Sequence, residues 1–321
     1  MAREHVNHRE IAQFAKDRVN LPKDKADQFR TQAKGLRDKL ENYISEHPDF
    51  NLKKMLLSGS LAKGTALRSL NDIDVACYIS GADVPSDISE LVEYLAEKLR
   101  NAYPNFQPDQ VQAKTYCVTV SFRGSGLDVD VVPVLYYGDP DWYGKLVSQT
   151  DGSLLDTCIP RHLEFIRKRK QAQPEHFSQV IRLAKYWVKH MKKEKDGFRF
   201  KSFMVELVMS KLLDEGKDLS DYPEALQHFF TYFAASNLDE LISFTDYYPK
   251  SKLEAHTERV KIIDPVNPKN NASKLYTTRE AEMIVDAALE AGDALDAALA
   301  ATTKEKTVYY WQKIFGSSFN V

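Results

Sequence analysis

The chain of 321 residues has a formal net charge of −2, with 43% hydrophobic and 28% charged residues. This balance is typical of a globular protein and excludes a mainly disordered chain, and the charge argues against a broad basic surface for long nucleic acid. No apolar run approaches the roughly 18 residues of a spanning helix, and the N-terminus lacks a secretory signal. At roughly 100–200 residues per domain, the length predicts two domains or one bilobal one.

The cysteines Cys77, Cys117 and Cys158 lie far apart in the sequence, with no Cys-x-x-Cys pair among them. This spacing argues against a zinc ribbon or a disulfide framework. The eight histidines also show no metal-ligand spacing. The cysteine usage predicts a reducing compartment, and we therefore expect a cytoplasmic protein.

The first predicted element is a long helix over about residues 23–46. Its apolar residues, among them Phe29, Leu36 and Leu40, recur at steps of three or four and so share one face. At a rise of about 1.5 Å per residue the helix would be roughly 36 Å long. We expect it to brace the fold.

An apolar stretch at 55–57 and alternating residues at 72–79 predict two strands. Apolar residues recurring on one face predict a helix at 86–101. Two β-rich runs, 116–122 and 127–132, predict a hairpin around a Gly-containing turn. Pro133 is expected to end the second hairpin strand, because proline donates no backbone hydrogen bond.

The second half of the chain is predicted to be helical. A capping box at Thr277 and Glu280 marks the start of one helix. The expected helices cover 159–171, 176–193, 201–214, 222–235 and 278–300. We therefore predict an α+β protein with a mixed-sheet lobe over residues 1–155 and a helical lobe over 156–321. The aromatic tail around Tyr309–Phe319 is expected to dock on its own lobe or on a partner.

Paired aspartates carry the main chemical signal. Asp72 and Asp74 flank Ile73 in a predicted strand, so both carboxylates lie on the face opposite the core. Two such carboxylates repel each other unless a cation lies between them, and Mg²⁺ prefers carboxylate oxygens. Asp128 and Asp130 repeat the pattern. If the strands are neighbours, three carboxylates can hold two metal ions, which suits phosphoryl transfer.

Gly59 and Ser60 precede the first aspartate pair by about a dozen residues. Glycine lets backbone N–H groups approach a phosphate closely, and the serine adds a hydroxyl. A lone Gly-Ser pair is weak, but followed by the two aspartate strands it predicts a nucleotide site.

With these motifs the sequence resembles the nucleotidyltransferases of the DNA polymerase β superfamily. Within it, the sequence is similar to the bacterial CD-NTases of CBASS antiphage systems, which are related to cyclic GMP-AMP synthase and oligoadenylate synthetase. The likeness lies in LSGSLAKGTALRSLNDIDVACYI, LDVDVVPV, VIRLAKYWVK, KSFMVELVMSKLL, IDPVNPKNNAS and the ending YYWQKIFGSSFNV. It implies a bilobal nucleotidyltransferase fold. The zinc insertion of the animal enzymes is absent, so direct activation by double-stranded DNA or RNA is not expected.

The resemblance implies a metal triad of Asp72, Asp74 and Asp130, with two Mg²⁺ ions, or Mn²⁺ in their place. Asp130 is preferred to Asp128 because it directly precedes Val131, as in the family motif. Whether Asp128 also contributes to the metal site stays open.

The resemblance also implies substrate-binding residues. Gly59, Ser60, Lys185 and Ser202 correspond to the triphosphate site, and Phe203 stands where the family often has a tyrosine that stacks on the donor base. Each has a plain structural alternative: a turn for Ser60, a surface helix lysine for Lys185, a helix N-cap for Ser202 and core packing for Phe203.

The resulting hypothesis is a template-independent synthase that makes a cyclic adenylate, with cyclic tri-AMP as the first choice, from ATP. Asp130 would accept the proton of the attacking hydroxyl. The implied partners are a HORMA-type regulator and a nuclease effector that responds to the product. The alternatives are a linear oligoadenylate synthase, an AMPylating enzyme, and a catalytically silent scaffold for nucleotide or RNA. The basic runs 167–170 and 192–193 are interpreted as solvated helix faces, or else as a rim for phosphate or a partner.

Overall fold

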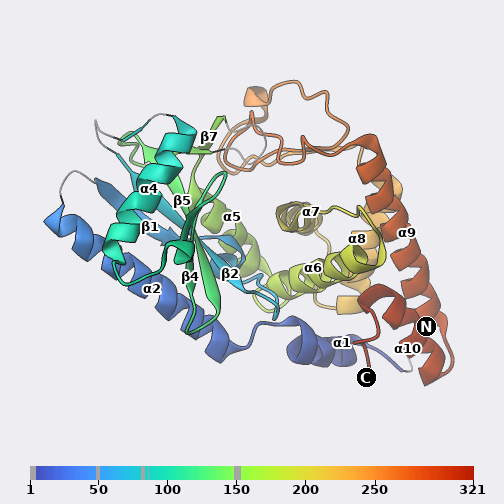
Figure 1. The fold of residues 1–321 in the computed structure, drawn as a ribbon. Helices are drawn as coiled ribbons and strands as arrows, with labels where there is room; N and C mark the ends of the chain where they lie inside the picture. The colour runs from blue at the N-terminus through green and yellow to red at the C-terminus, as the bar shows by residue number, and fades with distance from the viewer. Residues whose placement is uncertain (1–4, 48–50, 81–83, 86, 148–152) are drawn as a thin grey trace. The chain divides into compact units, whose positions relative to one another are not determined.

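The structure is a computed structural model that describes residues 5–47, 51–80, 84–85, 87–147 and 153–321 (Figure 1). The chain divides into two compact units. The sheet unit is Leu21–Glu164, and the helical unit consists of Met1–Asn20 and Phe165–Val321.

The sheet unit contains a mixed sheet of seven strands within the described residues. The strand order is β1-β2-β5-β4-β3, with β6 paired to β5 and β7 to β6. Strands β2 and β5 are parallel, and the other pairs are antiparallel. The strands are β1 Leu52–Leu57, β2 Asp72–Ile79, β3 Val111–Ala113, β4 Val118–Phe122, β5 Leu127–Tyr136, β6 Gly144–Val147 and β7 Leu154–Thr157.

The core of this unit lies between one face of the sheet and the helices α2 (Lys23–Glu46) and α4 (Ile88–Ala102), which lie against it in Figure 1. Successive side chains of a strand point to opposite faces of the sheet, so every second residue enters this core. Ile73 and Val129 are two of them and are at most 1% exposed. Phe29, Leu36 and Leu40 of α2 join the same core, which confirms the long predicted helix. The side chains of Ile44 and Ile88, predicted on these helix faces, lie outside the described part.

The opposite face of the sheet is apolar only in its second half. Ala76, Tyr78 and Val134 form a small buried cluster there. The backbone N–H of Ile159, which begins α5 (Ile159–Ala172), donates to the Tyr78 hydroxyl at 3.1 Å. The first half of this face carries the aspartates.

The predicted hairpin is confirmed as β4 and β5, but the expected end at Pro133 is wrong. Strand β5 continues to Tyr136, and Pro133 pairs with Cys77 of β2. The pairing with β4 stops at Val131 and the pairing with β6 begins at Val134. Proline therefore lies between the β4 and β6 ladders, so its missing N–H costs no bond to either of these two strands.

The helical unit confirms the helix-rich second half. Its α6, α7, α8 and α9 begin and end within one residue of the predicted bounds, and α9 has the expected capping box at Thr277 and Glu280. Helices α1 and α10 and the short strands and turns of this unit were not predicted from the sequence. The elements are α1 His8–Phe14, a π-helical turn Ala15–Val19, α6 Phe177–Glu194, α7 Ser202–Asp214, α8 Tyr222–Ser236, β8 Leu241–Ile242, a 3₁₀ turn Lys250–Lys252, β9 Lys261–Ile262, α9 Thr278–Ala300 and α10 Lys304–Phe315.

The compact units differ from the expected division at residue 155. Residues 5–20 pack with the rest of the helical unit: the Phe14 ring lies 5.2 Å from that of Phe315, and the Asn20 amide bonds the Gln179 side chain at 2.8 Å. The later boundary falls inside α5, at Glu164 and Phe165. The N-terminal segment therefore belongs to the helical unit by its contacts, although it precedes the sheet unit in the sequence.

Two further expectations are corrected or resolved in the helical unit. Arg169 is not solvated: it is 7% exposed, bonds the carboxylates of Asp214 and Asp246, and lies over the Phe165 ring. The aromatic tail docks on its own unit as α10, where Trp311 is fully buried.

All three cysteines are free and buried. Within the described residues, no helix combines the length and the hydropathy needed to cross a membrane.

Candidate active site

The register of two parallel strands brings the predicted carboxylates together. Asp72 of β2 is opposite Asp128 of β5, and Asp74 is opposite Asp130. All four point away from the core, because their neighbours along each strand are buried in it. Two cross-strand pairs of aspartates, Asp72 with Asp128 and Asp74 with Asp130, therefore lie on one face of the sheet where both strands begin.

The neighbouring strand β4 adds a hydroxyl to each pair. Thr119 is opposite Asp130, and its Oγ1 donates to Asp130 Oδ1 at 2.6 Å. Ser121 is opposite Asp128, and its Oγ donates to Asp128 Oδ1 at 2.6 Å. We call Asp74–Asp130–Thr119 the inner rung and Asp72–Asp128–Ser121 the outer rung.

The electrostatics of this face are dominated by negative charge. Partial burial raises the pKa of Asp72 above its ordinary value, although the residue as a whole is exposed, and the Asp130 and Asp128 carboxylates raise it further. Burial also raises the pKa of the nearby Cys117 thiol to about 12, with Asp130 adding to the shift. Carboxylates that face each other on neighbouring strands favour a cation or a shared proton.

Gly59 provides the space that the inner rung needs. Its φ is +61°, and a Cβ atom on it would lie 1.8 Å from Asp74 Oδ2. The backbone N–H of Ser58 donates to the Asp74 carbonyl at 2.8 Å, which ties the turn to β2. Only glycine fits both the left-handed backbone and the contact with the carboxylate.

Ser60 follows in the short helix α3 (Gly59–Lys63), where its side chain is half-buried and its carbonyl accepts from the Thr65 N–H at 2.9 Å. The structure thus places Gly59 beside Asp74, and Ser60 is the next residue along the chain. Among the predicted site residues, Gly59 and the aspartates are brought together in the sheet unit.

The donor set fits a divalent cation in kind. Carboxylate oxygens are the ligands that Mg²⁺ and Mn²⁺ prefer, and Mg²⁺ keeps water and substrate phosphates in its shell. Within the described residues, no three His, Cys, Asp or Glu side chains lie close enough together to hold an ion by themselves. Mutual repulsion is a physical reason for carboxylates to stay apart.

Lys185 lies in the helical unit, on α6. It is 5% exposed, and its Nζ donates to Glu206 Oε1 of α7 at 2.6 Å. Glu206 is itself 2% exposed, so the two charges form a buried pair. The alternative of a lysine lying along an exposed helix surface is therefore wrong.

Ser202 and Phe203 begin α7. The N-cap is Lys201, so Ser202 is the first helical residue rather than the cap, and it is exposed. Phe203 is half-buried. Ser202 therefore keeps a solvent-accessible hydroxyl, and Phe203 is not a fully buried core residue.

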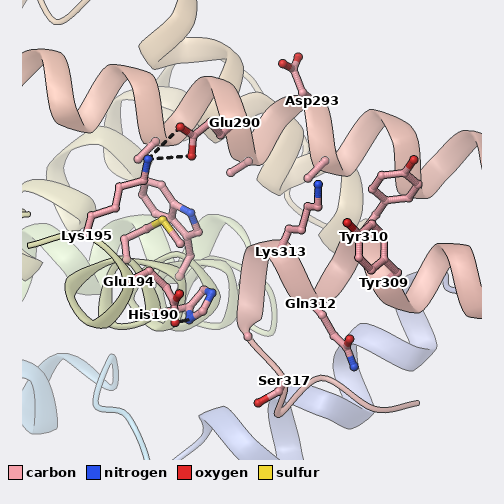
Figure 2. Close-up of a pocket in the computed structure, with 16 residues that line it drawn as sticks. His190, Glu194, Lys195, Glu290, Asp293, Tyr309, Tyr310, Gln312, Lys313 and Ser317 are labelled. Atoms are coloured by element: carbon pink, nitrogen blue, oxygen red, sulfur yellow. Dashed lines mark hydrogen bonds and ion pairs between the residues drawn. The ribbon is translucent and has the colours of Figure 1, made fainter.

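A separate pocket of about 790 Å³ lies between α6, α9 and α10 of the helical unit (Figure 2). Lys195 bonds Glu290 across it at 2.8 Å, and Lys313 lies 5.0 Å from the centre of the Tyr309 ring. None of the predicted site residues lines this pocket.

Sequence reasoning missed Thr119, Ser121 and Glu206. The two hydroxyl residues alternate with period two in the first hairpin strand, opposite the Asp-Val-Asp of the second. Counting the hairpin register from the turn at 123–126 predicts both contacts. No comparable local signal identifies Glu206 as the partner of Lys185.

The chain is similar to known proteins along nearly its whole length. Residues 6–151 match the family model of the Second Messenger Oligonucleotide or Dinucleotide Synthetase domain. The chain is 64% identical over 319 residues to the cyclic AMP-AMP-AMP synthase of Escherichia coli strain MS 115-1, which is 99% of each chain. It is 33% identical over 322 residues to the CBASS oligonucleotide cyclase CdnC of E. coli strain KTE188, which is 98% of each chain.

Solved structures of CdnC from E. coli MS115-1 have nearly the same fold. The structure with ATP matches with a TM-score of 0.95 and 64% identity, over 99% of this chain and 100% of that one. The complex with HORMA-deltaN matches with a TM-score of 0.94 and 62% identity, over 100% of each chain.

Proposed function

We propose, because the chain belongs to the family of second messenger oligonucleotide or dinucleotide synthetases, that it converts ATP into cyclic AMP-AMP-AMP. Each step would join a ribose hydroxyl to the α-phosphate of an ATP and release pyrophosphate, and the last step would close the ring. The identity of 64% along nearly the full length supports this product. The observation in the structure that carries the proposal is the inner rung beside Gly59.

Asp72, Asp74 and Asp130 would hold the divalent ions, Mg²⁺ or Mn²⁺. Bound ions would neutralise charge at the attacking and leaving oxygens of the phosphoryl transfer. The Asp130 carboxylate would accept the proton of the attacking hydroxyl at Oδ2, since Oδ1 already accepts from Thr119. Gly59 leaves room for Asp74, and the Ser60 hydroxyl would bond a phosphate oxygen.

Lys185, Ser202 and Phe203 of the helical unit would bind the donor nucleotide. The exposed Ser202 hydroxyl suits the triphosphate, and the half-buried Phe203 ring suits stacking on the adenine. The Lys185 ammonium is buried against the Glu206 carboxylate, so its contact with the triphosphate would require this pair to rearrange.

The partner we propose is a HORMA-type protein, since CdnC has been solved in complex with HORMA-deltaN. This partner would regulate the synthase. A nuclease that responds to the product would complete an antiphage system of the CBASS kind, the context given by the name of one relative. The free, buried cysteines support action in the cytosol.

The test is incubation of the purified chain with each nucleoside triphosphate and Mg²⁺ or Mn²⁺, with and without its HORMA partner. We expect pyrophosphate release with ATP and a product with the mass of cyclic tri-adenylate. The Asp74→Asn variant is the control and should yield none. An active chain whose product is not cyclic tri-adenylate would contradict the proposal.

The alternatives give different products. A linear oligoadenylate keeps a 5′-triphosphate and loses phosphate to phosphatase, whereas a ring resists it. AMPylation adds AMP to a protein, which intact-mass measurement detects. A scaffold binds nucleotide and releases no pyrophosphate under any of these conditions.

A further inference from the structure

The inner rung contains a contact with a polar side chain outside the predicted triad. Thr119 Oγ1 donates to Asp130 Oδ1 at 2.6 Å, and both side chains are half-buried. A distance of 2.5–2.7 Å is typical of a hydroxyl bound to an ionised carboxylate, the stronger class of hydrogen bond. The bond therefore constrains the carboxylate in the native state.

What it constrains is the rotation of the carboxylate. The last torsion of an aspartate is broad, so the backbone alone leaves the direction of both oxygens undefined. A hydrogen bond to Oδ1 from the neighbouring strand fixes that torsion. Oδ2 of Asp130 then has a defined direction on the face shared with Asp74.

The donor is itself held in place. Thr119 is β-branched and lies in the middle of β4, between the buried residues Val118 and Val120. A β-branched side chain has few accessible χ1 rotamers in a strand. The hydroxyl therefore points at the carboxylate without a large loss of side-chain entropy.

We propose that Thr119 is a positioning residue of the active site, which orients the Asp130 carboxylate for metal binding and for accepting the proton. This inference rests on the proposed function, since it assumes that Asp130 is the working carboxylate of β5. It also distinguishes the two rungs: the equivalent bond from Ser121 goes to Asp128, whose orientation should matter less.

The test compares Thr119→Val, which removes the hydroxyl and keeps the shape, with Thr119→Ser, which keeps the hydroxyl. Ser121→Ala is the matched control, because it removes the same bond from the outer rung. Mn²⁺ binding is measured on the nucleotide-free protein by electron paramagnetic resonance, ATP turnover separately, and folding by thermal melting.

We expect Thr119→Val to weaken Mn²⁺ binding and lower kcat by about 10-fold or more, as loss of a residue that orients a metal ligand typically does. Thr119→Ser should restore both to within about threefold of the native protein, and Ser121→Ala should change Mn²⁺ binding less than Thr119→Val does. A KM for ATP unchanged in Thr119→Val would agree with a role in orienting the carboxylate.

Native Mn²⁺ binding and turnover in a well-folded Thr119→Val would overturn the proposal. So would a larger loss in Ser121→Ala than in Thr119→Val, since Asp128 would then be the carboxylate that matters. A native protein that binds Mn²⁺ but makes a different product would overturn the proposed product only, and the comparison of Mn²⁺ binding would still decide the role of Thr119.

Discussion

The two units of the molecule hold their proposed site residues by opposite electrostatic means. In the sheet unit, carboxylates face each other across β2 and β5, and partial burial together with the Asp130 and Asp128 carboxylates raises the pKa of Asp72. In the helical unit, the ammonium of Lys185 is buried against the carboxylate of Glu206. One site gathers carboxylates on one face, and the other pairs a carboxylate with an ammonium.

This difference makes the effect of removing a charge depend on the unit. Replacing an aspartate of the sheet face by asparagine keeps its shape and relieves repulsion, so it should not destabilise the fold. Removing one partner of the buried pair leaves an uncompensated charge in a medium of low dielectric, which is strongly unfavourable. Stability measurements can therefore separate the two regions even where activity is lost in both.

The largest effect is expected from Asp74→Asn. We predict a loss of ATP turnover of about 1,000-fold, because bound metal contributes several kcal/mol to phosphoryl transfer. The free energy of unfolding in metal-free buffer should stay the same or rise, since one of the repelling charges is gone. Urea denaturation and a turnover assay measure both, and easier unfolding of the variant would contradict the comparison.

Glu206→Ala, in contrast to Asp74→Asn, should destabilise the fold. It leaves the Lys185 ammonium buried beside a cavity, and we predict a loss of about 3–5 kcal/mol in the free energy of unfolding. The double variant Lys185→Met with Glu206→Leu should recover most of that stability and remain inactive, if Lys185 binds the triphosphate.

The matched control for Glu206 is Glu215→Ala. Glu215 is exposed and pairs with Lys211 at the end of α7, and such surface pairs contribute about 0–1 kcal/mol. Equal losses in both variants would mean that burial does not govern the pair. An active double variant would remove Lys185 from the proposed site.

Gly59→Ala tests how close the turn must come to the inner rung. The new Cβ would collide with Asp74 Oδ2, and a displacement of about 1 Å in a reacting group can cost about 100-fold in rate. Gly124→Ala in the β4–β5 turn is the control, because a Cβ there meets nothing within 4 Å. Turnover and thermal melting of both variants measure the effect, and native turnover in Gly59→Ala would contradict the proposed packing.

The smallest effect concerns pH. The pKa of Asp72 is raised above its ordinary value of 3.8 by burial and by Asp130 and Asp128. Between pH 3.8 and the raised pKa of Asp72, the native state binds more protons than the unfolded chain. The contribution of Asp72 to the free energy of unfolding therefore falls as pH rises through this range. Asp72→Asn lacks this slope.

The measurement is the free energy of unfolding of both proteins in metal-free buffer across that pH range. The advantage of Asp72→Asn over the native protein should grow as pH rises and become constant above the raised pKa. An advantage that shrinks with rising pH would mean that the native fold favours the charged form of Asp72.

The sheet site was largely predictable because strand geometry is local. Alternation places Asp72 and Asp74 on one face with Ile73 in the core, and the hairpin turn sets the register of β4 on β5. The sequence left one thing open, namely whether the two aspartate strands are neighbours. Their parallel pairing follows from the whole sheet rather than from either segment.

In the helical unit the helices were predictable, but the partners of their charged side chains were not. Periodicity located α6 and α7, but which face of each meets the other depends on packing throughout the unit, so the pairing of Lys185 with Glu206 was not visible. Arg169 was misread for the same reason, since both of its carboxylate partners lie more than forty residues away in the chain.

The most direct test of the central claim is anomalous diffraction from Mn²⁺ in crystals grown with a non-hydrolysable ATP analogue. The account predicts manganese bonded to the carboxylates of Asp72, Asp74 and Asp130 and to phosphate oxygens of the nucleotide. Nucleotide bound without manganese on these aspartates, or manganese held by other side chains, would contradict it.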